Sequence, residues 1–355
     1  MKLVSVLLIL CLLTACAPAT RPSLPTPTIR LSTLTPAPTV TPYPTPTRAP
    51  TWTPEATRTA AVSISTPDPY GAYSITELRL RTYGSGEIEN LGVMGKMDGF
   101  VRYSIRYPSD GLKIYAFVNI PVGDGPFPVI IALHGYVNPP EYQTFDYTTD
   151  AADGLAQQGY LVIHPNMRNF PPSDNGDVLF RAGYAIDVLN LIALVQRGAR
   201  QPGLFEKANA GRIGIWSHSM GADIALKVAV ISRDVKAILL YSPMSGDEQK
   251  NSQFFNFMTG SSENQKEMLA SPETFASVSP DRYYKDITAA IQLHHGTGDT
   301  VIPVAWAQET CQELKDAGRN VQCFYYDGAE HTFRIRYLVD FSPRVDDFFA
   351  KYLKQ

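Results

Sequence analysis

Residues 214–223, GIWSHSMGAD, decide how the rest of this sequence is interpreted. They join a mostly apolar segment, which predicts a buried strand, to a segment with helical spacing, so Ser219 falls at a strand-to-helix turn. A serine on such a tight turn projects its hydroxyl from the carboxyl edge of a sheet, where it serves as a nucleophile. The alternative is a serine that only caps the N-terminus of the following helix.

The residues around Ser219 fit a tight turn, with one departure. Glycine usually stands two positions before the nucleophile, and Ser217 occupies that position here. Small residues are needed because the backbone passes close to itself, and Ser217 and Gly221 are both small. We expect the N–H of Met220, at the N-terminus of the predicted helix, to point at a developing oxyanion.

A serine nucleophile requires a base and a carboxylate that orients the base. Asp299 follows the predicted strand AAIQLHHG, and His331 follows the predicted strand VQCFYYD; His331 is the only histidine after Asp299. With Ser219, each of the three residues follows a different strand at the carboxyl edge, where such sheets bind ligands. Asp327 and Glu330 are competing carboxylates, but they share the loop of His331.

Further residues are predicted around this site. A second oxyanion donor is expected after the apolar run 127–135; the N–H of Tyr136 is the candidate, with its hydroxyl as the alternative. His218, inside the serine motif, is expected to line the mouth of the pocket. Arg168, which follows another strand, is expected to border the substrate. No carboxylate–histidine cluster has ligand spacing, so we expect no metal and no cofactor.

Strand and helix signals alternate from about residue 100 onward. This alternation predicts an α/β fold with a mostly parallel sheet covered by helices on both faces. Asp110-Gly111, between two strand-like runs, predicts a hairpin. Residues 245–285 are polar and carry no strand signal. They are predicted to form a small helical insertion, either a lid over the site or a decoration of the surface.

The N-terminal part of the chain is of a different kind. A lysine and an apolar run end in Leu-Thr-Ala-Cys, which predicts a signal peptide (1–16) of lipoprotein type with acylation of Cys16. Residues 17–69 contain 13 Pro and 14 Thr, which favours a disordered, extended stalk. The domain is predicted to occupy 70–355, exported and anchored through lipid to the bacterial cell membrane or outer membrane.

The remaining composition narrows the partners. The net charge is −3 among 355 residues, and no basic block is present, so nucleic acid is not an expected partner. Cys311 and Cys323 are the only cysteines of the predicted domain. An exported protein can keep a disulfide, and the two residues stand on a predicted helix and the next predicted strand. A bridge and two free thiols are equally compatible with the sequence.

The order and spacing of five segments resemble those of α/β-hydrolase enzymes: FPVIIALHGY, LAQQGYLVIHPNMRN, GIWSHSMGAD, HHGTGDTVIP and GAEHTF. Within that superfamily, residues ~100–355 look most like the prolyl-oligopeptidase-type catalytic domain and the related dienelactone-hydrolase-like esterases. The resemblance implies acyl transfer by Ser219 with His331 and Asp299. Three departures bear on the substrate: no propeller repeat precedes residue 100, the nucleophile is not the cysteine of dienelactone hydrolases, and Ala222 replaces a second glycine.

The sequence therefore predicts an extracytoplasmic serine hydrolase that forms an acyl-enzyme. Its substrate is a small acyl ester or a peptide, with a slight preference for esters because no propeller restricts access. A catalytically silent binding protein is the alternative of another class, and a missing catalytic residue would favour it. A metal-dependent hydrolase is a third reading, which sensitivity to chelators would reveal.

Overall fold

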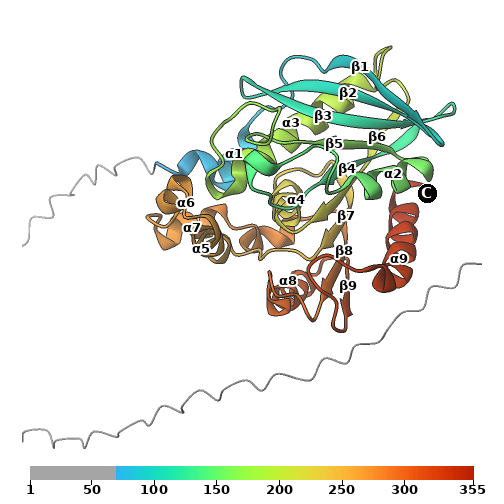
Figure 1. Ribbon diagram of the computed structural model, residues 1–355. Coiled ribbons are helices and arrows are strands. Elements are labelled where there is room, and N and C mark those ends of the chain that lie inside the picture. The colour runs from blue at the N-terminus through green and yellow to red at the C-terminus, as the bar shows by residue number, and fades with distance from the viewer. Residues whose placement is uncertain (1–68) are drawn as a thin grey trace, which may run out of the picture. The chain divides into compact units, whose positions relative to one another are not determined.

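A computed structural model describes residues 69–355, which contain a nine-stranded sheet in the order β1-β2-β3-β5-β4-β6-β7-β8-β9 (Figure 1). The predicted signal peptide, Cys16 and the stalk lie outside the described residues. The six strands from β5 to β9 in this order pair in parallel, as predicted. Their bounds are β4 Phe127–Leu133, β5 Leu161–Pro165, β6 Ala208–His218, β7 Val235–Tyr241, β8 Ala290–Gly296 and β9 Val321–Tyr326.

The other edge of the sheet is antiparallel. β2 (Phe100–Ser109) and β3 (Leu112–Pro121) form the predicted hairpin around Asp110-Gly111, and both turn residues have positive φ. β1 (Glu89–Met97) was not predicted from the sequence. Its residues are exposed or half-buried, and its pairing with β2 is interrupted at two places. An edge strand of this kind has no regular alternation of apolar and polar residues by which it could be recognised.

Helices cover both faces of the sheet, as predicted. α3 (Ala182–Gly198), α4 (Met220–Ile231) and α8 (Val304–Asp316) pack into one large core cluster. α2 (Thr149–Gln157) and α9 (Ile335–Leu353) pack into the cluster on the opposite face. The short α1 (Ile75–Leu80) contacts α4, and 3₁₀ turns occur at Gly71–Tyr73, Pro139–Glu141, Leu179–Arg181 and Pro280–Asp286.

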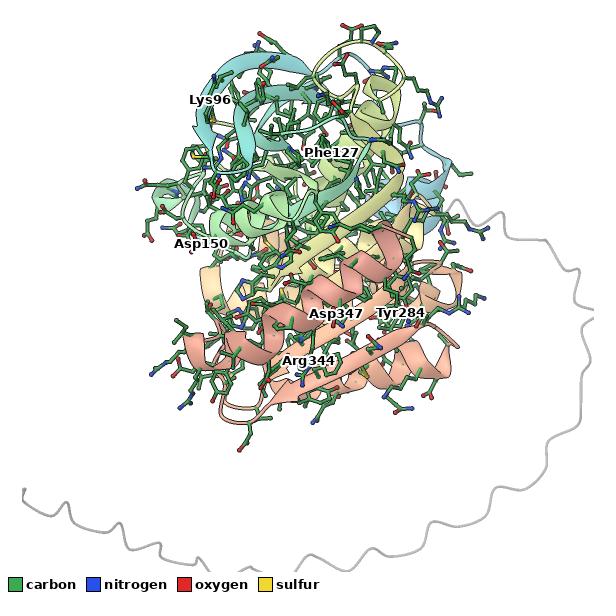
Figure 2. All side chains as sticks on the ribbon, turned by 90° about the vertical axis from the view of Figure 1, so that its right-hand side faces the viewer. Lys96, Phe127, Asp150, Tyr284, Arg344 and Asp347 are labelled. Carbon is green, nitrogen blue, oxygen red and sulfur yellow. A yellow bond between two sulfur atoms is a disulfide. The ribbon has the colours of Figure 1, made fainter. Side chains whose placement is uncertain are left out.

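The C-terminal helix is longer than its sequence pattern indicates. The sequence predicts a helix only over the final residues, whereas α9 begins at Ile335 and continues through Pro343. Figure 2 shows α9 lying across the sheet, with Arg344 and Asp347 on it. The Arg344 guanidinium lies over the ring of Phe324 at 4.6 Å and donates to the Tyr326 hydroxyl at 3.0 Å. These contacts with β9 help to keep α9 helical around Pro343, a residue type at which helices usually end or kink.

The predicted insertion is helical. α5 (Glu248–Thr259), α6 (Ser262–Glu267) and α7 (Pro272–Val278) follow one another between β7 and β8. Asp247, Ser261 and Ser271 cap these helices with side-chain hydrogen bonds to backbone N–H groups. Such caps explain how a polar segment without a strand signal forms three short helices.

Within residues 69–355, one helical segment is long and apolar enough to cross a membrane by length and composition, Leu179–Gly198. However, 89% of its most apolar window is buried inside the protein. The segment consists of the 3₁₀ turn Leu179–Arg181 and of α3, and it is therefore a buried helix of the core.

Cys311 on α8 and Cys323 on β9 form a disulfide, so the structure selects one of the two alternatives that the sequence left open. Cross-links that close loops of this length limit the freedom of the unfolded chain. We expect the Cys311→Ala/Cys323→Ala double variant to lose about 3 kcal/mol of unfolding free energy. A urea titration of the variant and of the oxidised wild type measures the difference. Wild type titrated with a reductant should match the variant, and identical midpoints for all three samples would contradict the expectation.

Candidate active site

Ser219 lies between β6 and α4 with a strained backbone, φ 55° and ψ −118°. A non-glycine residue in this region costs on the order of 1–3 kcal/mol and persists only when its surroundings hold it. Its N–H donates to the carbonyl oxygen of Tyr241 at 2.9 Å. Although Ser219 occupies the N-cap position of α4, its side chain makes no capping hydrogen bond. The capping alternative is therefore wrong, and the hydroxyl is free for another partner.

Two close approaches of the backbone and one side-chain hydrogen bond hold this turn. A Cβ on Gly221 would lie 2.5 Å from the Leu133 carbonyl oxygen, so only glycine lets α4 approach the end of β4. A Cβ on Gly135 would lie 3.1 Å from the Cβ of Ser219. Ser217, the departure from the usual glycine, is fully buried, and its hydroxyl donates to the carbonyl oxygen of Leu239 on β7. The extra side-chain atoms are accommodated because they gain a hydrogen bond to the neighbouring strand.

The structure brings Ser219, His331 and Asp299 together. The Nε2 atom of His331 lies 2.9 Å from the Ser219 Oγ, and its Nδ1 lies 2.7 Å from the Asp299 Oδ2. Both distances fit direct hydrogen bonds. The His331 loop is fixed because its carbonyl oxygen accepts a hydrogen bond from the Ser242 hydroxyl at 2.9 Å. The Asp299 side chain is buried, whereas the His331 side chain keeps 17% of its surface exposed.

The two competing carboxylates have other partners. Asp327 accepts from the Thr297 hydroxyl at 3.1 Å, and Glu330 pairs with Arg334 at 2.6 Å. Asp299 is thus the carboxylate that contacts His331, as the positions of the strand ends predict.

The carboxylate of Asp299 is surrounded by N–H groups. Its Oδ1 accepts from the backbone of Val301 at 2.8 Å and of Ile302 at 2.9 Å. Its Oδ2, which His331 contacts, lies 3.2 Å from the Nε2 of the fully buried His295, and that nitrogen also lies 3.1 Å from the Ile302 carbonyl oxygen. Burial alone would raise the pKa of Asp299, but hydrogen bonds from His295, His331 and Ile302 outweigh it and hold the pKa well below its usual value. Asp299 therefore remains charged across the neutral pH range.

The N–H groups of Tyr136 and Met220 are both free to bind a ligand. Tyr136 follows Gly135 in the loop after β4, and Met220 is the first residue of α4. Among residues 69–355, no hydrogen bond uses either N–H as a donor. Both residues line one cavity, which reaches the residue after Ser219, although neither Ser219 nor His331 is among its lining residues. The Tyr136 ring packs against Phe255 at 5.5 Å.

The cavity beside Ser219 has a volume of about 300 Å³. The insertion supplies one wall through Phe255, Thr259, Ser261, Glu263 and Asn264. Tyr184 and Arg181 contribute the floor on the side of α3. The insertion therefore borders the cavity that Tyr136 and Met220 also line.

Buried ion pairs fasten the insertion to the helix that follows Ser219. Arg181 contacts Glu248 of α5, Glu267 of α6 at 3.3 Å and Asp223 of α4 at 3.5 Å. Lys227 of α4 contacts both Asp223, at 2.7 Å, and Glu248. All five side chains are at most 4% exposed, and burial lowers the pKa of Lys227 to about 8.

Arg168 does not border the cavity, so the predicted substrate contact is corrected. Its guanidinium is buried and donates to both carboxylate oxygens of Asp187, with the shortest contact at 2.8 Å. A further donor reaches the Asp177 carbonyl oxygen at 3.0 Å. Arg168 fastens its loop to α3, because a planar guanidinium can donate to both oxygens of a carboxylate. The sequence does not indicate that Asp187 is the partner.

His218 lies beside His331 and does not line the cavity. Its Nε2 is 3.2 Å from the His331 carbonyl oxygen, and its ring stands 4.6 Å from that of Tyr241. Burial and the neighbouring His331 lower the pKa of His218 to about 3, so it stays neutral. The expectation that His218 lines the mouth is corrected: the ring supports the His331 loop.

Within residues 69–355, no three His, Cys, Asp or Glu side chains are grouped so that they could hold a metal ion. The adjacent His294 and His295 point to different partners. His294 contacts the Tyr326 hydroxyl at 2.8 Å, whereas His295 faces Asp299.

The sequence profile of the dienelactone hydrolase family matches residues 114–341, which is more than half of the chain. The chain belongs to the dienelactone hydrolase family. The match spans the loop after β4 and the Ser219, Asp299 and His331 positions, and it confirms the resemblance that the sequence segments suggested. This dienelactone hydrolase family member is accordingly an α/β hydrolase. A comparison with curated protein sequences gave no match.

Solved structures confirm the fold. Acetyl xylan esterase 1 from Thermoanaerobacterium sp. superimposes with a TM-score of 0.57 at 17% identity, covering 80% of this chain and 94% of the other. An esterase from Pyrococcus furiosus gives 0.55 at 19%, covering 74% and 98%. The acylaminoacyl peptidase of Pyrococcus horikoshii gives 0.58 at 19%, covering 78% of this chain but only 51% of the peptidase.

His295 contacts Asp299, whereas the sequence indicated only a structural role for the adjacent His294 and His295. Its position four residues before Asp299, at the end of a buried strand, was the available signal. We expect His295→Leu to lower kcat about tenfold, since Asp299 loses a donor, while KM changes little.

His295→Gln, which keeps a donor nitrogen, is the matched variant and should restore kcat. Urea midpoints of the two variants report any loss of folding. A residue that only fills space would change stability without lowering kcat, and an unchanged kcat in His295→Leu would refute the positioning role.

Proposed function

We propose that this protein is a serine esterase that works through an acyl-enzyme. The observation that carries the proposal is the chain of two hydrogen bonds from the Ser219 Oγ through His331 to Asp299, at 2.9 and 2.7 Å. The strained turn at Ser219 supports it, because such strain at a polar residue beside a cavity is typical of catalytic sites.

The geometry defines the first half of the reaction. With its Nδ1–H donating to Asp299, His331 presents an unprotonated Nε2 to Ser219 and accepts the hydroxyl proton as Oγ attacks the ester carbonyl carbon. The tetrahedral intermediate collapses when the bond to the leaving oxygen breaks. His331 then gives its proton to the leaving alcohol, and the acyl group remains on Ser219.

The second half repeats these steps with water. His331 takes a proton from water as the water oxygen attacks the acyl-enzyme, and the bond to the Ser219 Oγ then breaks. The proton returns to Ser219, and a carboxylic acid is released. In both halves the N–H groups of Tyr136 and Met220 stabilise the negative charge on the carbonyl oxygen, and the positive end of α4 adds to this.

Esters are favoured over peptides by what surrounds the site. The cavity of about 300 Å³ suits a small acyl or alcohol group. Two of the structural neighbours, which share the fold alone, are esterases by name. The acylaminoacyl peptidase keeps the alternative of amide cleavage open, although this chain spans only about half of it.

The second part of the proposal concerns location. We propose that Cys16 carries the lipid that anchors the exported domain to a bacterial membrane, on the evidence of the apolar run and the Leu-Thr-Ala-Cys sequence.

Substitutions in the three residues test the mechanism. Ser219→Ala should abolish turnover of p-nitrophenyl acetate, and Asp299→Asn should reduce kcat/KM by on the order of 10⁴, because His331 adopts the wrong tautomer. Asp327→Asn, a carboxylate in the His331 loop without contact to that ring, is the matched control and should keep activity. Wild-type rates in the Ser219 or Asp299 variants would exclude the mechanism. Efficient cleavage of a peptide anilide would move the protein to the peptidases.

The anchor is tested separately by fractionation. In the native host, the full-length protein should partition with membranes, and Cys16→Ala should leave a form without attached lipid by mass spectrometry. If the wild-type protein carries no acyl group, Cys16 is not an anchor.

A further inference from the structure

The polar lining of the cavity beside Ser219 includes a carboxylate without an ion pair and several oxygen acceptors, in addition to the free N–H groups of Tyr136 and Met220. The one cation in its lining, Arg181, is only 3% exposed. Its guanidinium is already matched by Glu248, Glu267 and Asp223, and it lies 4.9 Å from the centre of the Phe255 ring. Counted with Lys227, this cluster has three carboxylates against two cations. Arg181 therefore offers no unmatched positive charge to an anionic ligand.

Each amide nitrogen in the lining uses one of its two N–H groups within the protein. Asn169 binds Gly176 with both its nitrogen and its oxygen, at 2.9 and 2.8 Å. The nitrogen of Asn264 donates to Thr259 at 2.6 Å, and that of Asn138 donates to Glu141 at 3.0 Å. The side-chain oxygens of Asn138 and Asn264 have no partner within residues 69–355. Each of these two side chains therefore has an acceptor oxygen and one further N–H that a ligand can use.

Glu263 adds a charge to this set. It lines the cavity from α6 and makes no ion pair or hydrogen bond with any other described residue. Tyr184 lines the same cavity and is 5% exposed, and its hydroxyl has no partner in the described part of the chain. Burial raises the pKa of Tyr184; Arg181 lowers it, whereas Asp187, Tyr136 and Glu263 raise it further.

We propose that this cavity receives a primary ammonium group carried by the substrate, and that Glu263 is the residue that selects it. The proposal rests on the proposed esterase function and narrows its substrates to amino-bearing esters. An ammonium group brings three donors and no acceptor, which matches a carboxylate, two amide oxygens and a tyrosine hydroxyl. The rings of Tyr136 and Tyr184 also line the cavity, and aromatic rings attract cations. An anionic substrate would instead meet unpaired negative charge.

Two esters that differ in one group test this selection. The p-nitrophenyl esters of β-alanine and of butanoic acid have the same shape, with an ammonium group in place of a terminal methyl. Wild type is expected to prefer the β-alanyl ester after correction for spontaneous hydrolysis, and E263Q should lower the ratio of the two kcat/KM values about tenfold. Using the ratio cancels any general effect of the substitution.

Glu273→Gln is the matched control, because it removes the same charge from exposed α7, outside this cavity. It should leave the ratio as in wild type. An E263Q ratio equal to that of wild type, or a fall of the same size in both variants, would overturn the assignment. A preference for acetylated sugars over both esters, unaffected by E263Q, would also overturn it and indicate a neutral polyol.

Binding separates this proposal from the proposed reaction. Calorimetry with Ser219→Ala should detect butylammonium and should detect no binding once E263Q is added, whereas butanol should not bind either protein. If no ester is turned over but butylammonium binds through Glu263, the reaction is wrong and the ammonium site stands. If esters are cleaved by Ser219 and butylammonium does not bind, the ammonium site is wrong and the reaction stands.

Discussion

The close approach of α4 to the end of β4 is the constraint on which the rest of this site depends. Gly221 leaves room for the Leu133 carbonyl oxygen, and the same approach bends the chain so that Ser219 takes a positive φ. The bend presents the hydroxyl to His331 and places the free N–H of Met220 at the positive end of the helix. One backbone arrangement thus serves both the candidate nucleophile and the candidate oxyanion donor, and its strain is borne by the parallel strands on either side.

Much of this arrangement could be predicted because it follows from the order of strands. Parallel strands end at one edge, so residues that follow β6, β8 and β9 must meet there, and the loop after β4 joins them. Ser219, Asp299 and His331 were predicted together for this reason. The same reasoning selected Asp299 over Asp327, because an orienting carboxylate from a neighbouring strand end can face the ring of His331 while one from its own loop points elsewhere.

The features that escaped prediction depend on long-range partners. Arg168 follows a strand end, as a substrate-binding residue would, but its guanidinium forms a buried ion pair with Asp187 of α3. In the sequence, His294 and His295 are adjacent and cannot be told apart. Only the path of the backbone from His295 to Asp299 shows that His295 is the one that contacts the carboxylate. β1 has no apolar alternation, and α9 passes through Pro343 because its packing on the sheet outweighs the local cost. Local patterns carry no record of these contacts.

The buried ion cluster bears on how a substrate reaches Ser219. Glu248 and Glu267 belong to the insertion, whereas Asp223 and Lys227 belong to the helix after Ser219. Separating the insertion from α4 would leave buried charges unpaired, which typically costs about 3–5 kcal/mol for each broken pair. A lid that opens by hinging α5 away would have to bear this cost at every turnover. The cluster therefore favours an insertion that forms a fixed wall of the cavity. A wall fixed in this way can select substrates by charge, because Glu263 on α6 stays beside the cavity.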